Sequence, residues 1–293
     1  MTKTVLILGS TGKIGTHSAQ AFAANGWNVR KYDRATDLTQ AAMGVDVIVN
    51  GLNPPAYKNW AENIPKITRD VIKAAKASGA TVIIPGNVYN FGDNAGVWDE
   101  NTPQKTRTKK GNIRIEMERT FRESGVPTIV LRAGNFIDPE RNDDVMSVVL
   151  MRNIAKGKLT MMGRAGATQA YCFLPDWARA AVALANKRTE LAKFEDIPFP
   201  GHSFTMEELK EGLEATTGPL KFEGFPWWMM AALAPFWELA RELREMRYLW
   251  NLDHQLSGKK FAKLLPDFDV TPLATVMIAG LPDDTPQGQA QPA

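Results

Sequence analysis

The sequence predicts an α/β protein in which a doubly wound parallel sheet carries a smaller, mainly helical C-terminal lobe. First, short apolar runs rich in β-branched residues alternate with helix-like segments over about the first 135 residues, as parallel strands alternate with crossover helices. Second, a glycine-rich loop follows the first apolar run. Third, the alternation breaks up after Asp138. The 293 residues, 44% of them apolar, suffice for one such domain and an attached lobe.

The strands of the sheet are predicted from near-continuous apolar runs, which are typical of strands buried on both faces. They are Val5–Leu8, Trp27–Tyr32, Val45–Asn50, Thr81–Pro85 and Pro127–Leu131. The intervening helices are predicted at Gly12–Asn25, Asn59–Ser78 and Lys109–Ser124, each followed by a glycine suited to a helix C-terminus. Only eleven residues separate Arg34 from Asp46. We therefore expect an abbreviated second crossover and a reduced or missing third strand.

The domain boundaries follow from the same pattern. Residues 1–140, with parts of 165–200, are predicted to form the sheet domain, about 141–280 the lobe, and 281–293 a disordered tail. The later elements are predicted as a helix near Asp144–Lys156, strands at Lys158–Met162 and Ala170–Leu174, a helix at Pro175–Lys187, a strand near Phe194–Phe199, a helix at Met206–Thr217 and a long amphipathic helix from the Trp227 region to near Trp250.

The glycine-rich loop predicts a Rossmann-type site for a nicotinamide dinucleotide. Its sequence is Gly9-Ser10-Thr11-Gly12-Lys13-Ile14-Gly15, placed between a buried strand and an amphipathic helix. The glycines permit the tight turn, the approach of the pyrophosphate and close helix–strand packing, while the helix N-terminus supplies amide donors. Asp33 at the end of the second strand favours NAD and Arg34 favours NADP. The choice between the two cofactors stays open.

Several further motifs resemble the extended short-chain dehydrogenase/reductase superfamily, in its atypical branches and its NAD-dependent epimerase/dehydratase type. They are the GxxGxxG loop, Val45-Asp46-Val47-Ile48-Val49, Val88-Tyr89, Leu131-Arg132-Ala133-Gly134-Asn135-Phe136 and Leu174-Pro175-Asp176-Trp177-Ala178, within roughly Thr4 to Lys187. Beyond the loop, the resemblance implies cofactor contacts at strand ends. These are Leu52, Asn53, Pro85, Gly86, Lys110, Ala133, Gly134, Asn135 and Phe136.

The catalytic triad of that superfamily is substituted. Pro85 stands at the Ser/Thr position, Lys110 at the Tyr position and Arg114 at the Lys position. Lys110, Arg114 and Glu118 instead resemble the K-x-x-[IV]-R-x-x-x-E element of isoflavone-reductase-like and NmrA-like proteins. That resemblance implies that Lys110 is a general acid or base beside the nicotinamide, with Arg114 on the same helix face. Alternatively, Lys110 has no catalytic role, and Thr106-Arg107-Thr108-Lys109-Lys110 is a solvated basic loop that leads into a surface helix.

Other candidate residues lie where open α/β sheets bind ligands. Asn87 is expected to polarise a substrate carbonyl or hydroxyl, and Tyr89 is either a second proton donor or a packed ring. Pro54 and Tyr57, in the stiff loop after the third predicted strand, are candidate substrate contacts. Trp227 is expected at the mouth of a substrate pocket.

The aromatic and Met-rich segment that begins at Trp227 is otherwise expected to be lobe core or a self-association face. In the helix that follows, Arg241, Arg244 and Arg247 alternate with Glu242 and Glu245, which predicts a solvated, ion-paired face.

Composition excludes several other classes of function. The net charge of +3 and the absence of a basic arm argue against nucleic acid. No stretch approaches the ~20 apolar residues of a membrane span, so no membrane partner is expected. A single cysteine, Cys172, favours a reducing cytoplasm, and three histidines without ligand spacing predict no metal site.

The leading functional hypothesis is an NAD(P)H-dependent oxidoreductase that reduces a small, fairly apolar carbonyl or activated alkene, with Lys110 as the proton donor. One alternative is an NAD-dependent epimerase or dehydratase acting on a sugar nucleotide. Another is a non-catalytic NmrA-like regulator that senses the dinucleotide. The missing triad is consistent with this alternative, because a sensor needs no catalytic residues. The expected partner is a small-molecule substrate, and a homodimer is left open.

Overall fold

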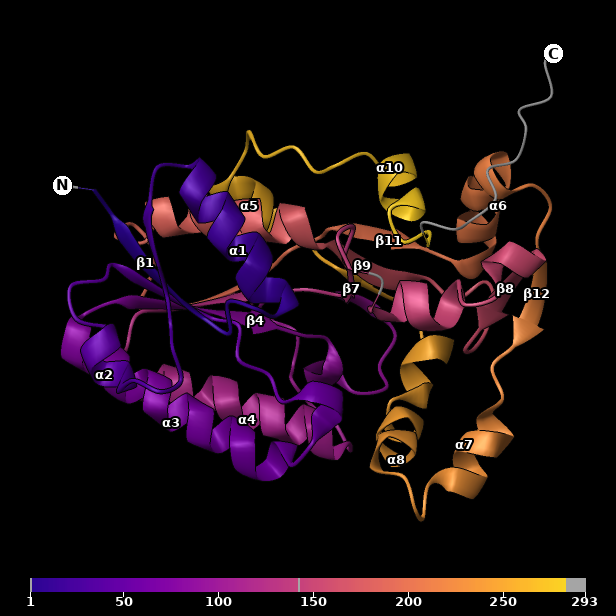
Figure 1. The fold of residues 1–293 in the computed structure, drawn as a ribbon, viewed down its shortest axis with the longest axis horizontal. Helices are drawn as coiled ribbons and strands as arrows, with labels where there is room; N and C mark the ends of the chain where they lie inside the picture. The colour runs from indigo at the N-terminus through magenta and orange to yellow at the C-terminus, as the bar shows by residue number, and fades with distance from the viewer. Residues whose placement is uncertain (1, 142, 283–293) are drawn as a thin grey trace.

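The computed structural model describes residues 2–141 and 143–282, and its centre is a six-stranded parallel sheet (Figure 1). The strand order is β2-β1-β3-β4-β6-β10, and every neighbouring pair is parallel. The strands are β1 (Thr4–Leu8), β2 (Asn28–Lys31), β3 (Val47–Asn50), β4 (Thr81–Gly86), β6 (Thr128–Arg132) and β10 (Phe194–Pro198). This confirms the predicted fold class and all of the strands predicted for the sheet.

Helices cover both faces of this sheet (Figure 1). On one face α1 (Lys13–Ala24) packs against α5 (Leu174–Asn186), with Phe22 and Trp177 in a shared apolar core. On the other face lie α2 (Leu38–Ala41), α3 (Trp60–Ser78) and α4 (Lys109–Ser124), packed on a second core that includes Ile64 and Phe121. Because successive residues of a strand point to opposite faces, Ile7 joins the first core and Leu8 the second.

The short second crossover is confirmed. Four residues of α2 are its only helix, and in the described part of the chain β2 pairs with β1 and forms the edge of the sheet. Asp37 starts α2 by accepting a hydrogen bond from the Gln40 amide, at 2.8 Å. The chain then returns directly to β3, on the far side of β1, because the interval is too short for another strand.

The lobe is built from short, separate pairings of strands. They are β11-β9-β7 (His202–Phe204, Gln169–Phe173, Asn135–Ile137), β12-β8 (Lys221–Gly224, Lys158–Met161) and β13-β5 (His254–Leu256, Gly96–Trp98). Helices α6 (Met206–Thr217) and α10 (Leu273–Ile278) complete it with α7 and α8, described below, whereas α9 (Lys259–Leu264) packs on β10 of the central sheet. The predicted tail lies outside the described residues from position 283 onward.

Two helix predictions in the lobe are wrong. The expected helix near Asp144–Lys156 is a π turn, η3 (Met146–Leu150), followed by a 3-10 turn, η4 (Ile154–Lys156). Non-helical backbone at Asn153 separates the two turns, and its side chain donates a hydrogen bond to Glu223 on β12 instead. Gly157 then adopts a left-handed conformation that leads into β8.

The second wrong prediction is the continuous helix up to Trp250. The structure has α7 (Trp227–Leu233), a turn, α8 (Glu238–Glu245) and a 3-10 turn, η5 (Arg247–Asn251). Pro235 lies in the turn between the two helices, and proline lacks the amide that a continuing helix needs. α7 and α8 therefore form a hairpin that we call the α7–α8 hairpin.

Candidate functional site

The glycine-rich loop brings β1, β3 and α1 into close backbone contact. A Cβ on Gly15 would lie 2.1 Å from the Gly9 carbonyl oxygen, and one on Gly9 would lie 2.9 Å from the Gly51 carbonyl oxygen. Gly9 also has a positive φ of 70°, which glycine adopts without strain. A Cβ on Gly12, by contrast, would approach within 4 Å only the Gly9 oxygen, at 3.3 Å. The loop thus leaves space beside Gly12.

The N-terminus of α1 is open to an anionic group. Gly12 is its N-cap residue, no side chain caps the helix, and the first turn holds no acidic residue. The first amides of a helix have no intrahelical acceptor and carry partial positive charge. Lys13 adds a cation and pairs with Asp143 at 2.9 Å. These features fit the diphosphate of a dinucleotide.

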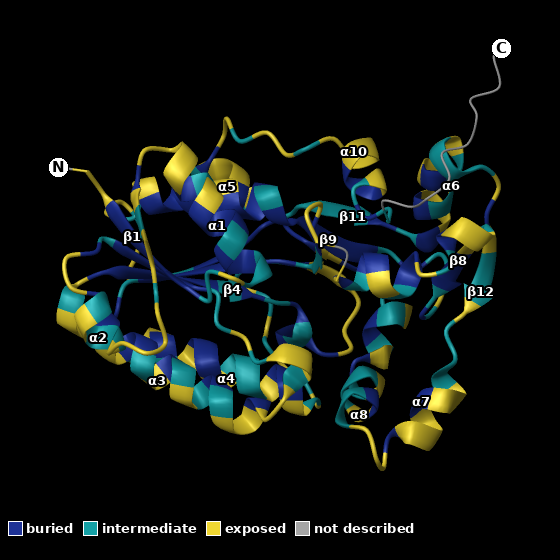
Figure 2. Cartoon of the chain, viewed as in Figure 1, coloured by how far each residue is buried: buried dark blue, intermediate teal, exposed yellow. Residues whose placement is uncertain are grey.

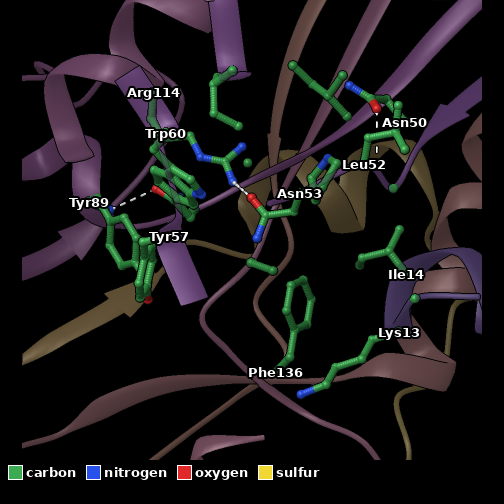
Figure 3. Close-up of a pocket in the computed structure, with 18 of the residues that line it drawn as sticks. Lys13, Ile14, Asn50, Leu52, Asn53, Tyr57, Trp60, Tyr89, Arg114 and Phe136 are labelled. Atoms are coloured by element: carbon green, nitrogen blue, oxygen red, sulfur yellow. Dashed lines mark hydrogen bonds between the residues drawn. The ribbon is translucent and has the colours of Figure 1, made fainter. Parts of the chain in front are cut away.

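A cavity of about 650 Å³ extends from this N-terminus along the carboxyl ends of β3, β4 and β6 (Figure 3). This is the edge at which open parallel sheets bind ligands. Most of the cofactor contacts predicted from the sequence line it. They are Gly12, Lys13, Ile14, Leu52, Asn53, Pro85, Gly86, Ala133, Gly134, Asn135 and Phe136.

The other predicted cofactor contacts lie outside the cavity lining. Gly9, Ser10, Thr11 and Gly15 form the back of the loop, and Thr11 accepts a hydrogen bond from Arg141, which does line the cavity. Asp33 and Arg34 are exposed after β2, and the Asp33 carboxylate accepts a hydrogen bond from the Ala35 amide at 2.9 Å. Because neither side chain lines the cavity, their position does not decide whether the cofactor is NAD or NADP.

At the far end of the cavity two phenols meet. The hydroxyls of Tyr57 and Tyr89 lie 3.1 Å apart, and both rings line the cavity (Figure 3). Tyr89 and then burial raise the pKa of Tyr57 well above the ordinary value of a tyrosine. Tyr57 therefore keeps its proton at neutral pH. The predicted substrate contact Tyr57 and the predicted proton donor Tyr89 thus form one hydrogen-bonded pair.

Arg114 faces the same end of the cavity. Its guanidinium lies 4.8 Å from the centre of the Trp60 ring, and its Nη2 donates to Asn53 Oδ1 at 3.4 Å (Figure 3). Burial lowers the pKa of Arg114 from its ordinary value. In the described part of the chain, Arg114 Nε and Trp60 Nε1 are buried without an acceptor. These two donors therefore have unused hydrogen-bonding capacity beside the cavity, although neither atom is itself exposed to it.

The loop that carries Tyr57 is strained. Ala56, Tyr57 and Asn59 all have positive φ, at 49°, 62° and 50°, a conformation that costs non-glycine residues energy. Strain of this kind persists only where neighbouring contacts hold it, and here Tyr57 contacts both Tyr89 and Trp60. Pro54, predicted as a substrate contact, lies just before this loop and outside the cavity lining.

Lys110 is buried but does not line the cavity. Its ammonium pairs with both Glu242 and Glu245 of α8, the latter at 2.6 Å, and lies 4.9 Å from the centre of the Tyr57 ring. The Lys110 amide also donates to Glu245, at 3.2 Å. Glu242 and Glu245 lie about 130 residues after Lys110 in the sequence. The local motif around Lys110 therefore could not predict these ion pairs. Lys110 thus joins α4 to the α7–α8 hairpin.

A second ion cluster lies beneath the cavity. Arg132, fully buried at the end of β6, pairs with Glu118 at 2.7 Å and Asp196 at 2.6 Å. Although burial disfavours the charge, the two carboxylates raise the pKa of Arg132 above its ordinary value. Arg132 also donates to the Asn87 carbonyl oxygen at 2.7 Å, while the Asn87 side chain accepts from the Tyr89 amide at 3.0 Å. The cluster therefore positions the loop that carries Tyr89.

Trp227 lies away from the cavity. Its indole nitrogen donates to the Met162 carbonyl at 2.7 Å, and its ring packs on Phe225 in the core of the lobe.

In the described ranges no three His, Cys, Asp or Glu side chains gather as metal ligands. The same ranges hold no helix long and apolar enough to cross a membrane.

Comparison with known proteins gives a family and a fold. The profile of the NAD dependent epimerase/dehydratase family matches residues 5–197. Comparison with curated protein sequences finds no match.

Several solved structures share the fold over nearly the whole chain. MoeE5 in complex with UDP-glucose and NAD has a TM-score of 0.74 at 14% identity, covering 94% of this chain and 97% of that one. A UDP-glucuronic acid 4-epimerase from Bacillus cereus in complex with NAD has a TM-score of 0.72 at 16% identity, covering 95% and 94%. A nucleoside-diphosphate-sugar epimerase from Staphylococcus aureus has a TM-score of 0.68 at 20% identity, covering 94% and 99%.

Proposed function

Because the chain belongs to the NAD dependent epimerase/dehydratase family, we propose that it binds a nicotinamide dinucleotide in the cavity and epimerises or dehydrates a sugar nucleotide. Two of the structures that share its fold contain NAD: MoeE5, which also holds UDP-glucose, and the UDP-glucuronic acid 4-epimerase. This proposal corresponds to one of the alternatives left open by the sequence rather than to net reduction of an apolar carbonyl.

One observation carries the proposal: the uncapped N-terminus of α1 opens into a cavity that follows the carboxyl ends of the central strands. The amides after Gly12 and the ammonium of Lys13 would hold the diphosphate. Asn53, Pro85 and Phe136 would line the path of the dinucleotide toward Tyr57. When bound, the nicotinamide supplies a hydride acceptor and, in its reduced form, a hydride donor.

The pair Tyr57–Tyr89 supplies the phenol chemistry that the substituted triad lacks. Tyr89 would exchange a proton with the substrate hydroxyl, and Tyr57 would donate a hydrogen bond to the Tyr89 oxygen when that proton leaves. Arg114, near both rings, contributes a positive charge that favours a negative oxygen there. Lys110 is assigned a positioning role, because two carboxylates hold its ammonium and it does not line the cavity.

Identification of the reaction products tests this function. The purified protein, loaded with NAD or NADP, is incubated with a panel of UDP-sugars, and the products are identified by NMR spectroscopy. We expect a sugar epimer or a dehydrated sugar without net consumption of the cofactor. Stoichiometric oxidation of the reduced cofactor by a carbonyl or an enone would indicate a reductase instead, and binding of the dinucleotide without any turnover would indicate a sensor.

Conservative variants test the two phenols. Tyr89→Phe and Tyr57→Phe should each lower turnover, with the larger loss at Tyr89 of about 10²- to 10⁴-fold, as for the removal of a general acid or base. Affinity for the dinucleotide should stay within a factor of about two. Tyr32→Phe is the matched control, because the Tyr32 hydroxyl donates to the Thr36 carbonyl outside the cavity lining. Equal turnover of Tyr89→Phe and the control would refute the assignment.

A further inference from the structure

The α7–α8 hairpin exposes an uncharged apolar tip. Residues 224–237, between Glu223 and Glu238, carry no charged side chain. Within this stretch the side chains of Phe236, Trp228 and Trp237 are 91%, 76% and 44% exposed. Soluble proteins rarely expose so many large apolar residues side by side without a partner.

The tip projects from the lobe and is held in shape. The hairpin runs alongside the sheet domain, where α8 contacts α4 through Lys110, and its turn is exposed at the bottom of the view (Figures 1 and 2). The Leu233 carbonyl accepts hydrogen bonds from the amides of Phe236 and Trp237, at 3.0 and 2.9 Å. Arg241 donates to the Ala234 carbonyl at 3.0 Å. Phe236 therefore lies on a hydrogen-bonded turn and is almost fully exposed.

The surface beside the tip is basic. Arg241, Arg244 and Arg247 are exposed along α8 and the turn after it. The carboxylates of Glu242 and Glu245 are turned inward onto Lys110, which leaves the arginines as the outer charges of this face, with Glu238 half-buried at its start. Three more exposed cations, Lys105, Arg107 and Lys109, lie in the segment that leads to Lys110.

We propose that the α7–α8 hairpin docks on the surface of an anionic lipid bilayer, with Trp228 and Phe236 inserted at the level of the headgroups. Aromatic residues beside Lys and Arg are typical of interfacial segments, whose apolar side enters the bilayer by about 5–10 Å. Arg241 follows Trp237 by four residues, which is about 6 Å along a helix, so its charge would lie at the headgroups. This docking is peripheral and involves no membrane span.

A second copy of the chain fits this surface less well. A stable protein interface buries about 800 Å² on each partner and requires complementary shapes. The exposed apolar side chains of the hairpin come from one short segment, residues 228–237. A two-fold interface would, moreover, bring two copies of the same cationic surface together, which adds repulsion between like charges. An anionic bilayer can bury the apolar tip and attract the cationic face at the same time.

Vesicle binding of the whole protein tests the docking without any assumption about its enzymatic activity. We expect the chain to co-sediment with phosphatidylcholine vesicles that contain phosphatidylglycerol, and to bind pure phosphatidylcholine vesicles more weakly. The double variant Trp228→Ser/Phe236→Ser should bind anionic vesicles at least about tenfold more weakly. Arg244→Gln should weaken that binding about fivefold and leave binding to neutral vesicles unchanged.

A matched control removes exposed apolar side chains elsewhere. Val97 and Val148 are 62% and 50% exposed, so Val97→Ser/Val148→Ser should keep wild-type binding. Light scattering of each variant reports the oligomeric state in the same samples. Absence of binding to anionic vesicles would overturn the proposal. A dimer that Trp228→Ser/Phe236→Ser dissociates would overturn it too, since the tip would then be a self-association face.

Discussion

Replacing Lys110 by methionine distinguishes a role as proton donor from a role in positioning the α7–α8 hairpin. Met keeps the apolar stem but removes the charge that joins α4 to α8 through Glu242 and Glu245. Breaking a fully buried pair costs about 3–5 kcal/mol because a charge is left without a partner. The two carboxylates here are 24% and 21% exposed and regain part of their hydration. We therefore expect Lys110→Met to lose about 2–3 kcal/mol of the hairpin's docking free energy.

Hydrogen exchange measures this loss directly. Amides of α8 should exchange about 30- to 150-fold faster in Lys110→Met, since each 1.4 kcal/mol is a factor of ten. Amides of β1 and β3 should be unchanged, and the dinucleotide should bind as before. Lys109→Met is the matched control, because the neighbouring Lys109 is exposed. Unchanged exchange in α8 together with abolished turnover would refute the positioning role and restore Lys110 as the proton donor.

Three further predictions concern stability and the cofactor loop. Arg132→Met leaves two buried carboxylates unpaired and should cost about 3–5 kcal/mol in urea unfolding; an unchanged midpoint would show that the cluster is not stabilising. Burial lowers the pKa of His254 from 6.5 to about 4. The unfolded chain therefore binds more protons between these values, and stability should fall by up to about 3 kcal/mol as the pH drops from 6.5 to 4, whereas His254→Phe should flatten this part of the profile. Gly15→Ala places a Cβ 2.1 Å from the Gly9 oxygen and should weaken dinucleotide binding about tenfold or more. Gly26→Ala should leave titrated binding unchanged, because Gly26 has φ +74° but no atom within 4 Å of a Cβ.

The sheet domain could be predicted because its signals are local. Each buried strand is an apolar run, and the long helices α1, α3 and α4 are each followed within two residues by a glycine. The short interval before Asp46 leaves no room for a further strand between β2 and β3. The cofactor loop is equally local, since its glycines are required by contacts within the segment and with Gly51 at the end of the next strand.

The lobe and the far end of the cavity depend on contacts between distant residues. β5 pairs with β13 across more than 150 residues, and neither three-residue strand has a pattern of its own. The alternation of Arg and Glu in α8 predicted ion pairs along one helix, but Glu242 and Glu245 turn to Lys110 instead. Tyr57 was predicted to contact the substrate, and its partner Tyr89 becomes evident only when the strained loop is in place.

Titration of the purified chain with the dinucleotide is the most direct test of the cofactor site on which the proposed function depends. The protein is stripped of bound nucleotide, and the heat of binding of NAD and of NADP is measured by calorimetry for the wild type and Gly15→Ala. We predict one site per chain for at least one of the two dinucleotides, weakened in the variant. Absence of binding of both by the wild type, or equal binding by wild type and variant, would contradict the account.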